Sequence, residues 1–442
     1  MAGLFGTDGI RGQANREITP ELALGLGKAI AQTLAAGSKV VIGRDTRRSG
    51  EMLSAAVAAG LTSTGVDAAD LGVVTTPCLA YATTRAGTDG GVMVSASHNP
   101  APDNGLKVIV AGRKLDDADE EELERLMAAP EELRRPPNAG LGRMRSDQAA
   151  IAEYQSHLAA AAGGAFAGLR IGIDCANGSA SAIAPDLFRA LGAEVTVLFA
   201  APDGDNINDG CGSTDPRLLA ETVIAARLDL GLAFDGDVDR LIAIDERGEL
   251  VDGDAIMGIC ALARLASGRL HNNVVVATVM SNGGLERALA SAGARLVRTP
   301  VGDRHVLEAM EREGADIGGE QSGHVIFRER STTGDGLLTA IELVSSMRAG
   351  GARPLSELAA QIPRLPQVML NSAVRRREEW ETDDQLAAAV KRAEEHLAGR
   401  GRILVRPSGT EPRLRIMVEG DDHDEIDAIA RELAGLAEAR LN

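Results

Sequence analysis

The sequence is poor in aromatic side chains, which make up only 2% of its 442 residues. A core with so few aromatic residues must be built mainly from Leu, Val, Ile and Ala, which suits the layered packing of helices against sheets. The chain is also too long to be organised around one hydrophobic core. We therefore expect several domains, each with helices packed on a sheet.

Cysteine is scarce and scattered, and Cys78, Cys175, Cys211 and Cys260 form no C-x-x-C pair. This spacing is unlike that of a disulfide framework or a zinc site, and it favours a reducing compartment. The first residues contain no basic segment followed by an apolar run, as a signal peptide would. No apolar stretch is long enough to cross a bilayer. These absences predict a soluble, cytoplasmic protein with no membrane partner.

Positive charge is in deficit as well, because 46 Lys and Arg residues stand against 64 Asp and Glu residues, giving a net charge of -18. Nucleic-acid binding requires clustered Lys and Arg to neutralise phosphates, so no nucleic-acid partner is expected. An acidic protein that binds a phosphorylated ligand must gather its positive charge at local sites. A cluster of Arg residues in this chain therefore indicates a binding site.

What the sequence does contain is a regular alternation of short apolar segments and amphipathic stretches. Strands are expected at residues 39–42, 169–174, 228–234 and 273–279, and a helix is expected at residues 51–64. This repeated strand and helix order predicts parallel or mixed sheets covered by helices, and hence an α/β fold.

Changes in composition along the chain predict its division into domains. Residues 130–147 are rich in Pro, Arg and Gly and indicate a linker. The last segment has the order strand, helix, strand, strand, helix, which is typical of a small α+β domain. We expect three α/β domains and a C-terminal α+β domain of ordinary size, at residues 1–147, 148–249, 250–364 and 365–442.

The first segment with the character of a site is VSASHNP at residues 94–100, followed by DNGLK at residues 103–107. An apolar strand runs into small and polar residues and then into a proline, so the loop exposes a hydroxyl at the end of a strand. His98 and Lys107 could supply protons or balance the charge of a phosphate. The alternative is an ordinary turn, which the S-x-S pattern alone does not exclude.

The second segment is DGDVDR at residues 235–240, directly after an apolar strand. The carboxylates of Asp235, Asp237 and Asp239 repel one another, so a cluster without a cation would be costly. Mg²⁺ removes this conflict because it prefers oxygen ligands, and the carboxyl end of a strand is where α/β sheets bind ligands. The sequence therefore predicts that these three aspartates bind Mg²⁺.

Three other interpretations of this second segment fit less well. A solvated acidic turn is less consistent with the apolar strand before it. An EF-hand loop requires Gly where Arg240 stands, and a strand-like segment follows. A phosphatase that acts through an aspartyl phosphate would use Asp235 as its nucleophile and usually has Thr or Val in place of Asp239.

The third segment is GGEQSGH at residues 318–324, between two expected short strands. Its glycines allow a ligand to approach the backbone closely, and Glu320, Ser322 and His324 offer the dense hydrogen bonding that sugar hydroxyls require. A hairpin turn is the alternative. The loop VGDRH at residues 301–305, with Asp303 and Arg304, could contribute to the same pocket.

The fourth segment is RPSGTEPR at residues 406–413, followed by Arg415. Hydroxyls, a glycine and guanidinium groups on one loop predict a phosphate site, because Arg meets phosphate oxygens in a bidentate manner. A solvated basic turn is the alternative. The four segments fall in successive expected domains, and a cleft between those domains is the simplest way to unite them.

These motifs resemble those of the α-D-phosphohexomutase superfamily, and within it most closely those of the bacterial phosphoglucosamine mutases. The resemblance starts at FGTDGIRG, residues 5–12, passes through the serine, aspartate and sugar-loop segments, and ends at residues 406–412, so it spans the whole chain. It implies a fold of four domains around a central cleft, with a mobile last domain.

The resemblance also assigns roles to individual residues. It implies that Ser97 carries a phosphate, that the three aspartates bind one Mg²⁺ per subunit, and that the phosphoserine supplies another metal oxygen. The other implied residues lie near the transferring phosphate (Arg11, His98, Lys107), in the sugar site (Arg240, Asp303, Arg304, Glu320, Ser322, His324) or on the loop for the other phosphate (Arg406, Ser408, Gly409, Thr410, Arg415).

The implied reaction is the isomerisation of D-glucosamine 6-phosphate to D-glucosamine 1-phosphate, which feeds UDP-N-acetylglucosamine and cell-wall synthesis. The phosphoserine would donate to the 1-hydroxyl, giving glucosamine 1,6-bisphosphate, which would turn over and return its 6-phosphate to Ser97. Lys107 or His98 would handle the hydroxyl proton. The expected partner is a small sugar phosphate, and a homodimer is compatible with the resemblance.

Two departures from the family pattern bear on the substrate, since His305 stands where Tyr is usual and Pro300 lies beside the same loop. A phosphomannomutase/phosphoglucomutase shares most of this machinery, although Glu320-Gln321-Ser322 and Ser95-Ala96-Ser97 favour glucosamine. A non-catalytic sugar-phosphate-binding protein is a further alternative. It would not need both Ser97 and the three aspartates.

Overall fold

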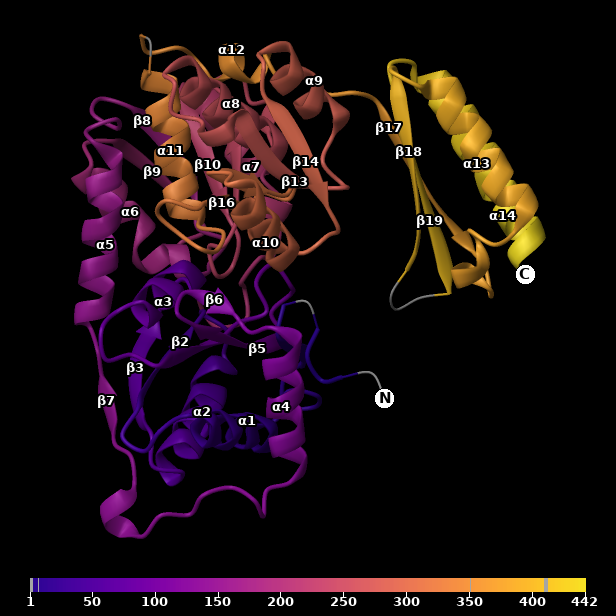
Figure 1. Cartoon of the computed structure of the whole chain (residues 1–442). Coiled ribbons are helices and arrows are strands. Elements are labelled where there is room, and N and C mark those ends of the chain that lie inside the picture. Colours follow the sequence, from indigo (N-terminus) through magenta and orange to yellow (C-terminus); the bar gives the residue numbers. More distant parts are fainter. Residues whose placement is uncertain (1–2, 7, 350, 409–411) are drawn as a thin grey trace. The chain divides into compact units, whose positions relative to one another are not determined.

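The computed structural model describes residues 3–6, 8–349, 351–408 and 412–442. The chain forms two compact units. The first comprises Met1–Thr278 and Val297–Gln361, and the second comprises Val279–Leu296 and Ile362–Asn442. The described residues form four sheets, which agrees with the predicted four-domain α/β architecture (Figure 1). The boundaries at residues 147, 249 and 364 stay predictions.

The first sheet has the strand order β1-β5-β4-β2-β3-β7, and β6 pairs with β5. Helices α1 and α2 pack on each other on one face, and α3 lies on the other (Figure 1). Strand β5 runs antiparallel to β4, whereas β2 runs parallel to both β3 and β4. The elements are β1 (Ile10–Gln13), α1 (Pro20–Thr33), β2 (Lys39–Arg44), α2 (Gly50–Ser63), β3 (Asp67–Val73), α3 (Thr76–Thr83), β4 (Gly90–Val94), β5 (Asp103–Val110), β6 (Arg113–Lys114), α4 (Asp117–Ala128) and β7 (Met144–Ser146).

The segment that the sequence predicts to be a linker, residues 130–147, is not wholly irregular. Strand β7 lies inside this segment and pairs in parallel with β3 through the register of Ala68 with Met144. The segment is also tied to α1, because the Arg134 side chain donates to the Leu34 carbonyl at 2.8 Å. A strand of three exposed residues shows no alternation of apolar and polar residues. Its pairing through backbone hydrogen bonds cannot be predicted from the sequence.

The second sheet has the order β12-β11-β10-β8-β9, in which β10 is parallel to β8 and antiparallel to β11. All residues of β10 are buried, and α7 packs against β8 and β10. The predicted strands agree with the observed ones to within two residues. The elements are α5 (Ala149–Ala162), β8 (Arg170–Asp174), α6 (Ala184–Ala190), β9 (Glu194–Leu198), α7 (Arg217–Ala226), β10 (Leu230–Phe234), β11 (Leu241–Ile244) and β12 (Leu250–Val251).

The third sheet has the order β14-β13-β15-β16. Strand β15 is parallel to β13 and antiparallel to β16, so the loop after β15 is the turn of a hairpin. Helix α10 packs on β13 and β15 with a core that includes Val306 and Met310. The elements are α8 (Gly253–Ala266), β13 (Val274–Thr278), α9 (Gly283–Ser291), β14 (Arg295–Thr299), α10 (Asp303–Glu313), β15 (Ile317–Gly319), β16 (Val325–Phe327), α11 (Gly336–Arg348) and α12 (Leu355–Ala359).

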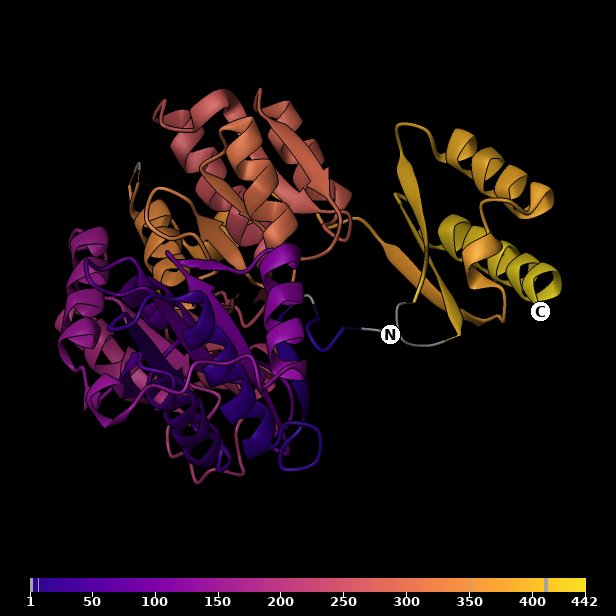
Figure 2. The same ribbon diagram turned by 60° about the horizontal axis from the view of Figure 1, so that its bottom comes forward.

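The last sheet lies in the second unit and has the antiparallel order β17-β19-β18. Helices α13 and α14 cover the same face of it (Figure 2). The predicted order of strand, helix, strand, strand, helix is confirmed. The elements are β17 (Gln367–Ala373), α13 (Asp384–Leu397), β18 (Gly401–Pro407), β19 (Arg413–Gly420) and α14 (His423–Leu441).

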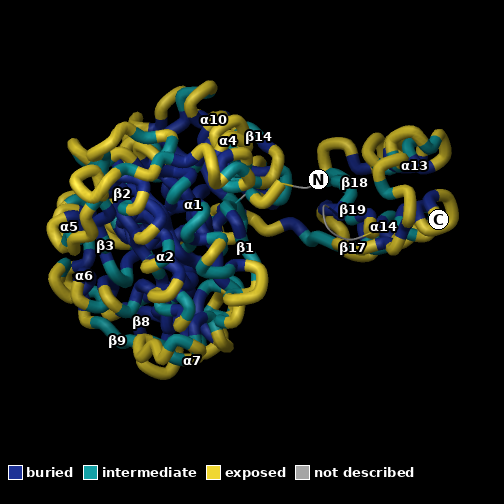
Figure 3. Tube along the Cα trace, turned by 90° about the horizontal axis from the view of Figure 1, so that it is seen from below, coloured by how far each residue is buried: buried dark blue, intermediate teal, exposed yellow. Residues whose placement is uncertain are grey.

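Burial follows the layers within each unit (Figure 3). Strands β4 and β10 are buried along their whole length, whereas α7 exposes Leu218 and Ile224 on its outer side. No helix in the described parts of the chain is both long enough and apolar enough to cross a membrane.

Candidate active site

The loop after β4 holds Ser97 at the carboxyl end of the first sheet. Ser97 is buried, and its φ of 53° places it in the left-handed region. A residue other than Gly in that region costs roughly 1 kcal/mol or more, so such strain persists only where the surrounding structure imposes it. The Ser97 hydroxyl donates to Asp235 Oδ2 at 2.6 Å. The ends of β4 and β10, from different sheets, therefore meet at this pair.

The three aspartates that follow β10 form a buried cluster. Asp235, Asp237 and Asp239 each offer a carboxylate oxygen within 4.8 Å of the other two. Burial, followed by repulsion from Asp239 and Asp237, raises the pKa of Asp235 well above its ordinary value. Asp237 Oδ1 and Asp239 Oδ1 are buried with no hydrogen-bond partner among the described residues. The donor set and these unsatisfied oxygens fit a hard divalent cation such as Mg²⁺.

Lys107, from β5, is the ammonium group closest to this cluster. Its Nζ lies 2.8 Å from Asp237 Oδ2 and 3.4 Å from Asp239 Oδ2, and its side chain is 1% exposed. Burial alone would lower the pKa of Lys107, but Asp237 and Asp239 raise it above its ordinary value. Lys107 is therefore charged. One ammonium group does not neutralise three carboxylates, and Arg240 adds a second positive charge, with its Nε 3.7 Å from Asp239 Oδ1.

His98 contacts the Ser97 hydroxyl, and Arg11 and Arg240 lie near enough to His98 to act on its charge. His98 Nδ1 lies 3.3 Å from Ser97 Oγ. Burial, together with Arg240 and Arg11, lowers the pKa of His98 to about 4, so its imidazole is neutral near pH 7. Arg240 donates its backbone N–H to Asp235 Oδ1 at 3.2 Å, and the Arg11 side chain contacts Asp8. The structure thus brings these predicted residues together beside the Ser97 loop and the aspartate cluster.

The predicted sugar loop is the turn between β15 and β16. The Ser322 hydroxyl donates to Glu320 Oε2 at 3.2 Å. His324 is buried, and neither of its ring nitrogens has a hydrogen-bond partner among the described residues. Burial alone would raise the pKa of Asp239, but nearby positive groups, Lys107 above all, lower it well below its ordinary value. The loop therefore presents polar groups beside the aspartate cluster.

The other predicted sugar-site residues lie at the start of α10. Asp303 Oδ2 lies 2.7 Å from Lys114 Nζ and 3.6 Å from His324 Nε2. Burial alone would raise the pKa of Asp303, but Lys114 and His324 lower it to about 2. Arg304 is directed elsewhere, because its side chain bonds Asp117 at 2.5 Å and Glu308 at 3.2 Å. Arg304 is thus the one of these residues that the structure does not direct toward the cluster.

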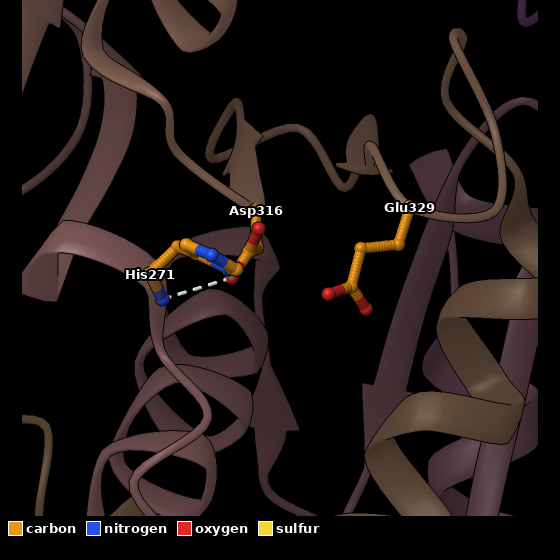
Figure 4. A group of neighbouring side chains, drawn as sticks. All are labelled: His271, Asp316 and Glu329. Carbon is orange, nitrogen blue, oxygen red and sulfur yellow. Dashed lines mark hydrogen bonds and ion pairs between the residues drawn. The ribbon is translucent and has the colours of Figure 1, made fainter.

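A further group of metal-ligand side chains, His271, Asp316 and Glu329, lies at the amino ends of β13 and β15, the opposite edge of that sheet from the sugar loop (Figure 4). Each carboxylate already has a partner. Asp316 Oδ2 accepts the His271 backbone N–H at 2.9 Å, and Glu329 Oε2 lies 3.4 Å from Arg264 Nη1. These contacts compensate the charge of the group, so it supports no metal assignment.

The predicted phosphate loop lies in the second unit. Arg406 in β18 stands directly opposite Arg415 in β19, and the Ser408 backbone N–H donates to the Arg413 carbonyl at 2.9 Å. Burial and the charge of Arg415 lower the pKa of Arg406. Two guanidinium groups so placed repel each other, and an anion would relieve that repulsion. The predicted Gly409 and Thr410 lie outside the described residues.

Comparison with known proteins decides the family. Models of the phosphoglucomutase/phosphomannomutase family match domain I at residues 2–134, domain II at residues 152–248, domain III at residues 252–365 and the C-terminal domain at residues 369–436. The phosphoglucosamine mutase of Symbiobacterium thermophilum is 54% identical over 100% of both chains. The chain belongs to this family. The phosphoglucosamine mutase of Moorella thermoacetica is 52% identical over 99% of this chain and 98% of its own.

Solved structures of phosphohexomutases share the fold. A phosphoglucomutase/phosphomannomutase family protein from Burkholderia thailandensis superposes with a TM-score of 0.84 at 24% identity, over 100% of this chain and 99% of that one. The N-acetylphosphoglucosamine mutase of Aspergillus fumigatus, in complex with GlcNAc-6P and magnesium, superposes with a TM-score of 0.69 at 19% identity, over 99% and 96% of the two chains. At these identities the likeness concerns the fold alone.

Sequence reasoning missed several residues that organise this phosphohexomutase site. Lys114 is one, because it bonds both Asp8 and Asp303. Thr76 is another, because its hydroxyl donates to Asp237 Oδ2 at 2.5 Å. Asp45 and Arg47 form a buried ion pair behind the Ser97 loop. A signal for this last pair was present, since GRDTRRSG at residues 43–50 places polar residues directly after an apolar strand.

Proposed function

We propose that this chain interconverts D-glucosamine 6-phosphate and D-glucosamine 1-phosphate through a phosphorylated Ser97. The observation that carries the proposal is the 2.6 Å contact between the Ser97 hydroxyl and Asp235, inside a buried cluster of three aspartates. Relatives 54% and 52% identical to it over nearly the whole chain are named phosphoglucosamine mutases.

The reaction balances as two transfers with no net loss of phosphate. Phosphoserine 97 gives its phosphoryl group to the 1-hydroxyl of glucosamine 6-phosphate, which loses its proton and becomes glucosamine 1,6-bisphosphate. The free Ser97 hydroxyl then takes the 6-phosphoryl group, and the 6-oxygen regains a proton. Ser97 is phosphorylated again at the end, and glucosamine 1-phosphate leaves.

The charges around Ser97 suit such a carrier. A phosphoserine brings about two negative charges at neutral pH into a region that already holds three carboxylates. Asp235, Asp237 and Asp239 would hold Mg²⁺, which offsets this charge and polarises the phosphoryl group when it is bound. Arg11 and Arg240 add guanidinium groups near the same aspartates, since both interact electrostatically with them. Their donors suit the oxygens of a phosphoryl group in transfer.

The two candidate proton carriers differ in charge. His98 is neutral near pH 7 because its pKa is lowered to about 4, and its Nδ1 lies 3.3 Å from Ser97 Oγ. It is therefore suited to accept a proton at this hydroxyl. Lys107 is charged, since Asp237 and Asp239 raise its pKa, and it is suited to donate. We assign the accepting role to His98 and the donating role to Lys107.

The remaining predicted residues receive binding roles under the same proposal. Glu320 and Ser322 present a carboxylate and a hydroxyl that suit the hydroxyls and the amino group of glucosamine, with Asp303 and His324 beside them. In the second unit, Arg406 and Arg415 with Ser408, Gly409 and Thr410 are assigned to a phosphate group.

The test is a mutase assay with the 6-phosphates of glucosamine, mannose and glucose, in the presence of Mg²⁺ and a trace of the corresponding 1,6-bisphosphate. We expect the highest kcat/KM with glucosamine 6-phosphate. A higher kcat/KM with mannose 6-phosphate or glucose 6-phosphate would show that the protein is a phosphomannomutase/phosphoglucomutase instead. Tight binding of all three without turnover would instead identify a sugar-phosphate-binding protein.

A further inference from the structure

Arg47 lies three residues beyond the end of β2, directly behind the Ser97 loop, and neither its side chain nor that of Asp45 has any exposed surface. A guanidinium group has five N–H donors. The Arg47 Nε donor goes to Asp45 Oδ2 at 2.9 Å. The four remaining donors all go to backbone carbonyls of the next loop, namely Ser97 at 3.0 Å, Asn99 at 2.7 Å, Pro100 at 2.5 Å and Asp103 at 2.9 Å.

This distribution separates Arg47 from the arginines that face the reacting phosphate. Its charge is compensated by Asp45, and every one of its donors is already bonded. It has no exposed surface through which a substrate could reach it. Arg47 therefore cannot bind the sugar phosphate directly, and its effect on the reaction must pass through the Ser97 loop.

Asn208 holds two of the same carbonyls from the other side. Asn208 lies in the segment that joins β9, a strand of the second sheet, to α7. Its Nδ2 donates to the Ser97 carbonyl at 2.9 Å and to the Asn99 carbonyl at 3.0 Å. The carbonyls of Ser97 and Asn99 are thus each bonded by both Arg47 and Asn208. We refer to Arg47 and Asn208 as the loop anchors.

Asp45 extends the arrangement to the amino side of Ser97. The Ser95 hydroxyl donates to Asp45 Oδ2 at 2.6 Å and accepts the Ser97 backbone N–H at 2.9 Å. Both the N–H and the carbonyl of Ser97 are therefore fixed by groups connected to the Asp45–Arg47 pair. The loop is also confined on the side of the aspartates, because a Cβ added to Gly236 would stand 2.6 Å from the Ser97 carbonyl oxygen.

These contacts explain how Ser97 keeps its left-handed backbone, with φ at 53°. A strained residue holds such a conformation only when its surroundings over-determine it. With the N–H and the carbonyl turned toward Ser95 and the loop anchors, the hydroxyl is left facing Asp235. A phosphoryl group on that hydroxyl must lie in line with its acceptor, and a small misplacement is costly in rate.

We propose that Arg47 and Asn208 are positioning residues for phosphoryl transfer, which act by fixing the backbone of Ser97 and do not touch the substrate. The inference rests on the proposed function of Ser97 as the phosphate carrier. It predicts that the loop anchors govern kcat, and that KM for glucosamine 6-phosphate depends on them little.

The test compares Arg47→Lys, Asn208→Gly and Arg48→Met with the unaltered protein. Lys can still reach Asp45 but lacks the fork of donors. Gly tolerates the φ of 59° at position 208 while removing the carboxamide. Arg48 is the matched control, since it neighbours Arg47 in the chain but is 70% exposed and pairs with Asp205. For each variant we would measure kcat, KM, the phosphate content of Ser97 by peptide mass and the melting temperature.

The expected result is a fall in kcat of about 10- to 100-fold for Arg47→Lys and about 10-fold for Asn208→Gly, with KM changed by less than about 3-fold. Arg48→Met should match the unaltered protein. If Arg47→Lys lowers the melting temperature so far that it does not fold, Asn208→Gly decides the question. Loop-anchor variants that fold, carry phosphate and keep the original kcat would overturn the inference.

Failure of the underlying function has a different signature. In that case the unaltered protein itself would carry no phosphate on Ser97 and would show no mutase turnover. If the unaltered protein is phosphorylated and active, and the loop-anchor variants keep its kcat, only the positioning role is refuted. A purely structural role for Arg47 would lower the melting temperature while leaving kcat per folded molecule unchanged.

Discussion

Ser97 Oγ and Asp235 Oδ2 lie 2.6 Å apart although they belong to different sheets. Ser97 follows β4 of the first sheet and Asp235 follows β10 of the second, and both strands are buried throughout. Apolar strands bring the two loops to the same place, and the polar residues at their ends then form one charged site.

Replacing Ser97 by Ala should abolish mutase turnover while leaving the fold intact. The change removes the phosphate acceptor and one hydrogen bond to Asp235, but no apolar packing. We expect residual kcat below about a thousandth of the original, since a covalent carrier has no substitute in this mechanism. The measurement is the coupled mutase assay together with peptide mass mapping. Ser156→Ala, an exposed helical serine, is the matched control.

If Ser97→Ala kept full activity, a mechanism through phosphoserine 97 would be ruled out. A loss of activity accompanied by phosphate on another serine would mean that a different serine is the phosphate carrier, while the proposed reaction would stand. Intact mass of the parent, before and after incubation with glucosamine 1,6-bisphosphate, distinguishes these results, because only a carrier gains one phosphate.

Replacing Asp237 by Asn should weaken Mg²⁺ binding much more than it weakens the fold. Asp237 contributes a buried oxygen with no hydrogen-bond partner among the described residues, while its other oxygen contacts Lys107 and Thr76. Asn keeps the shape and can still accept those two bonds. We expect Mg²⁺ affinity to fall by more than about 10- to 100-fold, the loss that follows removal of a mere outer-shell partner of a ligand, measured by calorimetry on the unphosphorylated protein. Asp209→Asn, on the exposed surface, is the control.

A collapse of the melting temperature with unchanged Mg²⁺ affinity would contradict this prediction. It would make the cluster a structural network held by Lys107. The calorimetric measurement is independent of catalysis, so it separates loss of the metal from loss of turnover.

Replacing Glu320 by Gln should raise KM for glucosamine 6-phosphate more than it lowers kcat. Glu320 accepts from the Ser322 hydroxyl at 3.2 Å and from the Gly302 backbone N–H at 3.2 Å, so Gln preserves the local shape while removing a charge. A charged hydrogen bond to the amino group contributes about 1.5–3 kcal/mol, or roughly 10- to 100-fold in affinity. The result to expect is a KM at least about 10-fold higher, with Glu308→Gln on α10 as the exposed control.

The same variant tested with glucose 6-phosphate separates recognition of the amino group from a general defect. Glucose 6-phosphate has no ammonium group, so its KM should change little. An equal rise in KM for both sugars would show that Glu320 contributes to packing of the loop, not to recognition of glucosamine.

The sequence predicted the buried strands well because their apolar character is local. The strands at residues 228–234 and 273–279 differ from β10 and β13 by no more than two residues at either end. The carboxylates after β10 were equally visible, since three acidic residues in five require a compensating charge. Strand β7 was missed because residues 144–146 are exposed on all sides and owe their conformation to backbone bonds with β3.

The residues that support the site were harder to predict than those that form it. Arg47 is separated from Ser97 by fifty residues, and Asn208 by more than a hundred, so their bonds to one carbonyl follow only from the arrangement of two sheets. The left-handed backbone of Ser97 likewise leaves no trace in composition. Arg304 shows the opposite error. The sequence places it in a predicted site motif, but its side chain is paired with Asp117 and Glu308.

Asp335 gives a prediction about pH that does not involve the reacting groups. It caps α11 by accepting the Leu338 backbone N–H at 2.9 Å, and it accepts the Tyr154 hydroxyl at 2.8 Å. Burial raises the pKa of Asp335 to about 6 despite these bonds. Because this carboxyl binds its proton more tightly in the folded than in the unfolded chain, its contribution to stability is complete below about pH 4 and is lost as the pH rises through about 6.

Asp335→Asn should therefore stabilise the protein near pH 7 while changing its stability little near pH 4. The two bonds go to different oxygens of Asp335, so Asn keeps its oxygen for the Leu338 N–H and turns its NH2 toward the Tyr154 oxygen, which can accept. The substitution also removes the buried charge, whose ionisation costs on the order of 2–3 kcal/mol for a shift of about two units. The measurement is the melting temperature of both proteins from about pH 4 to pH 8, with Asp384→Asn in the first turn of α13 as the control. The difference between Asp335→Asn and the parent should grow between about pH 4 and pH 6 and then level off. A constant difference across this range, or destabilisation at neutral pH, would mean that Asp335 is ionised in the folded protein at no cost.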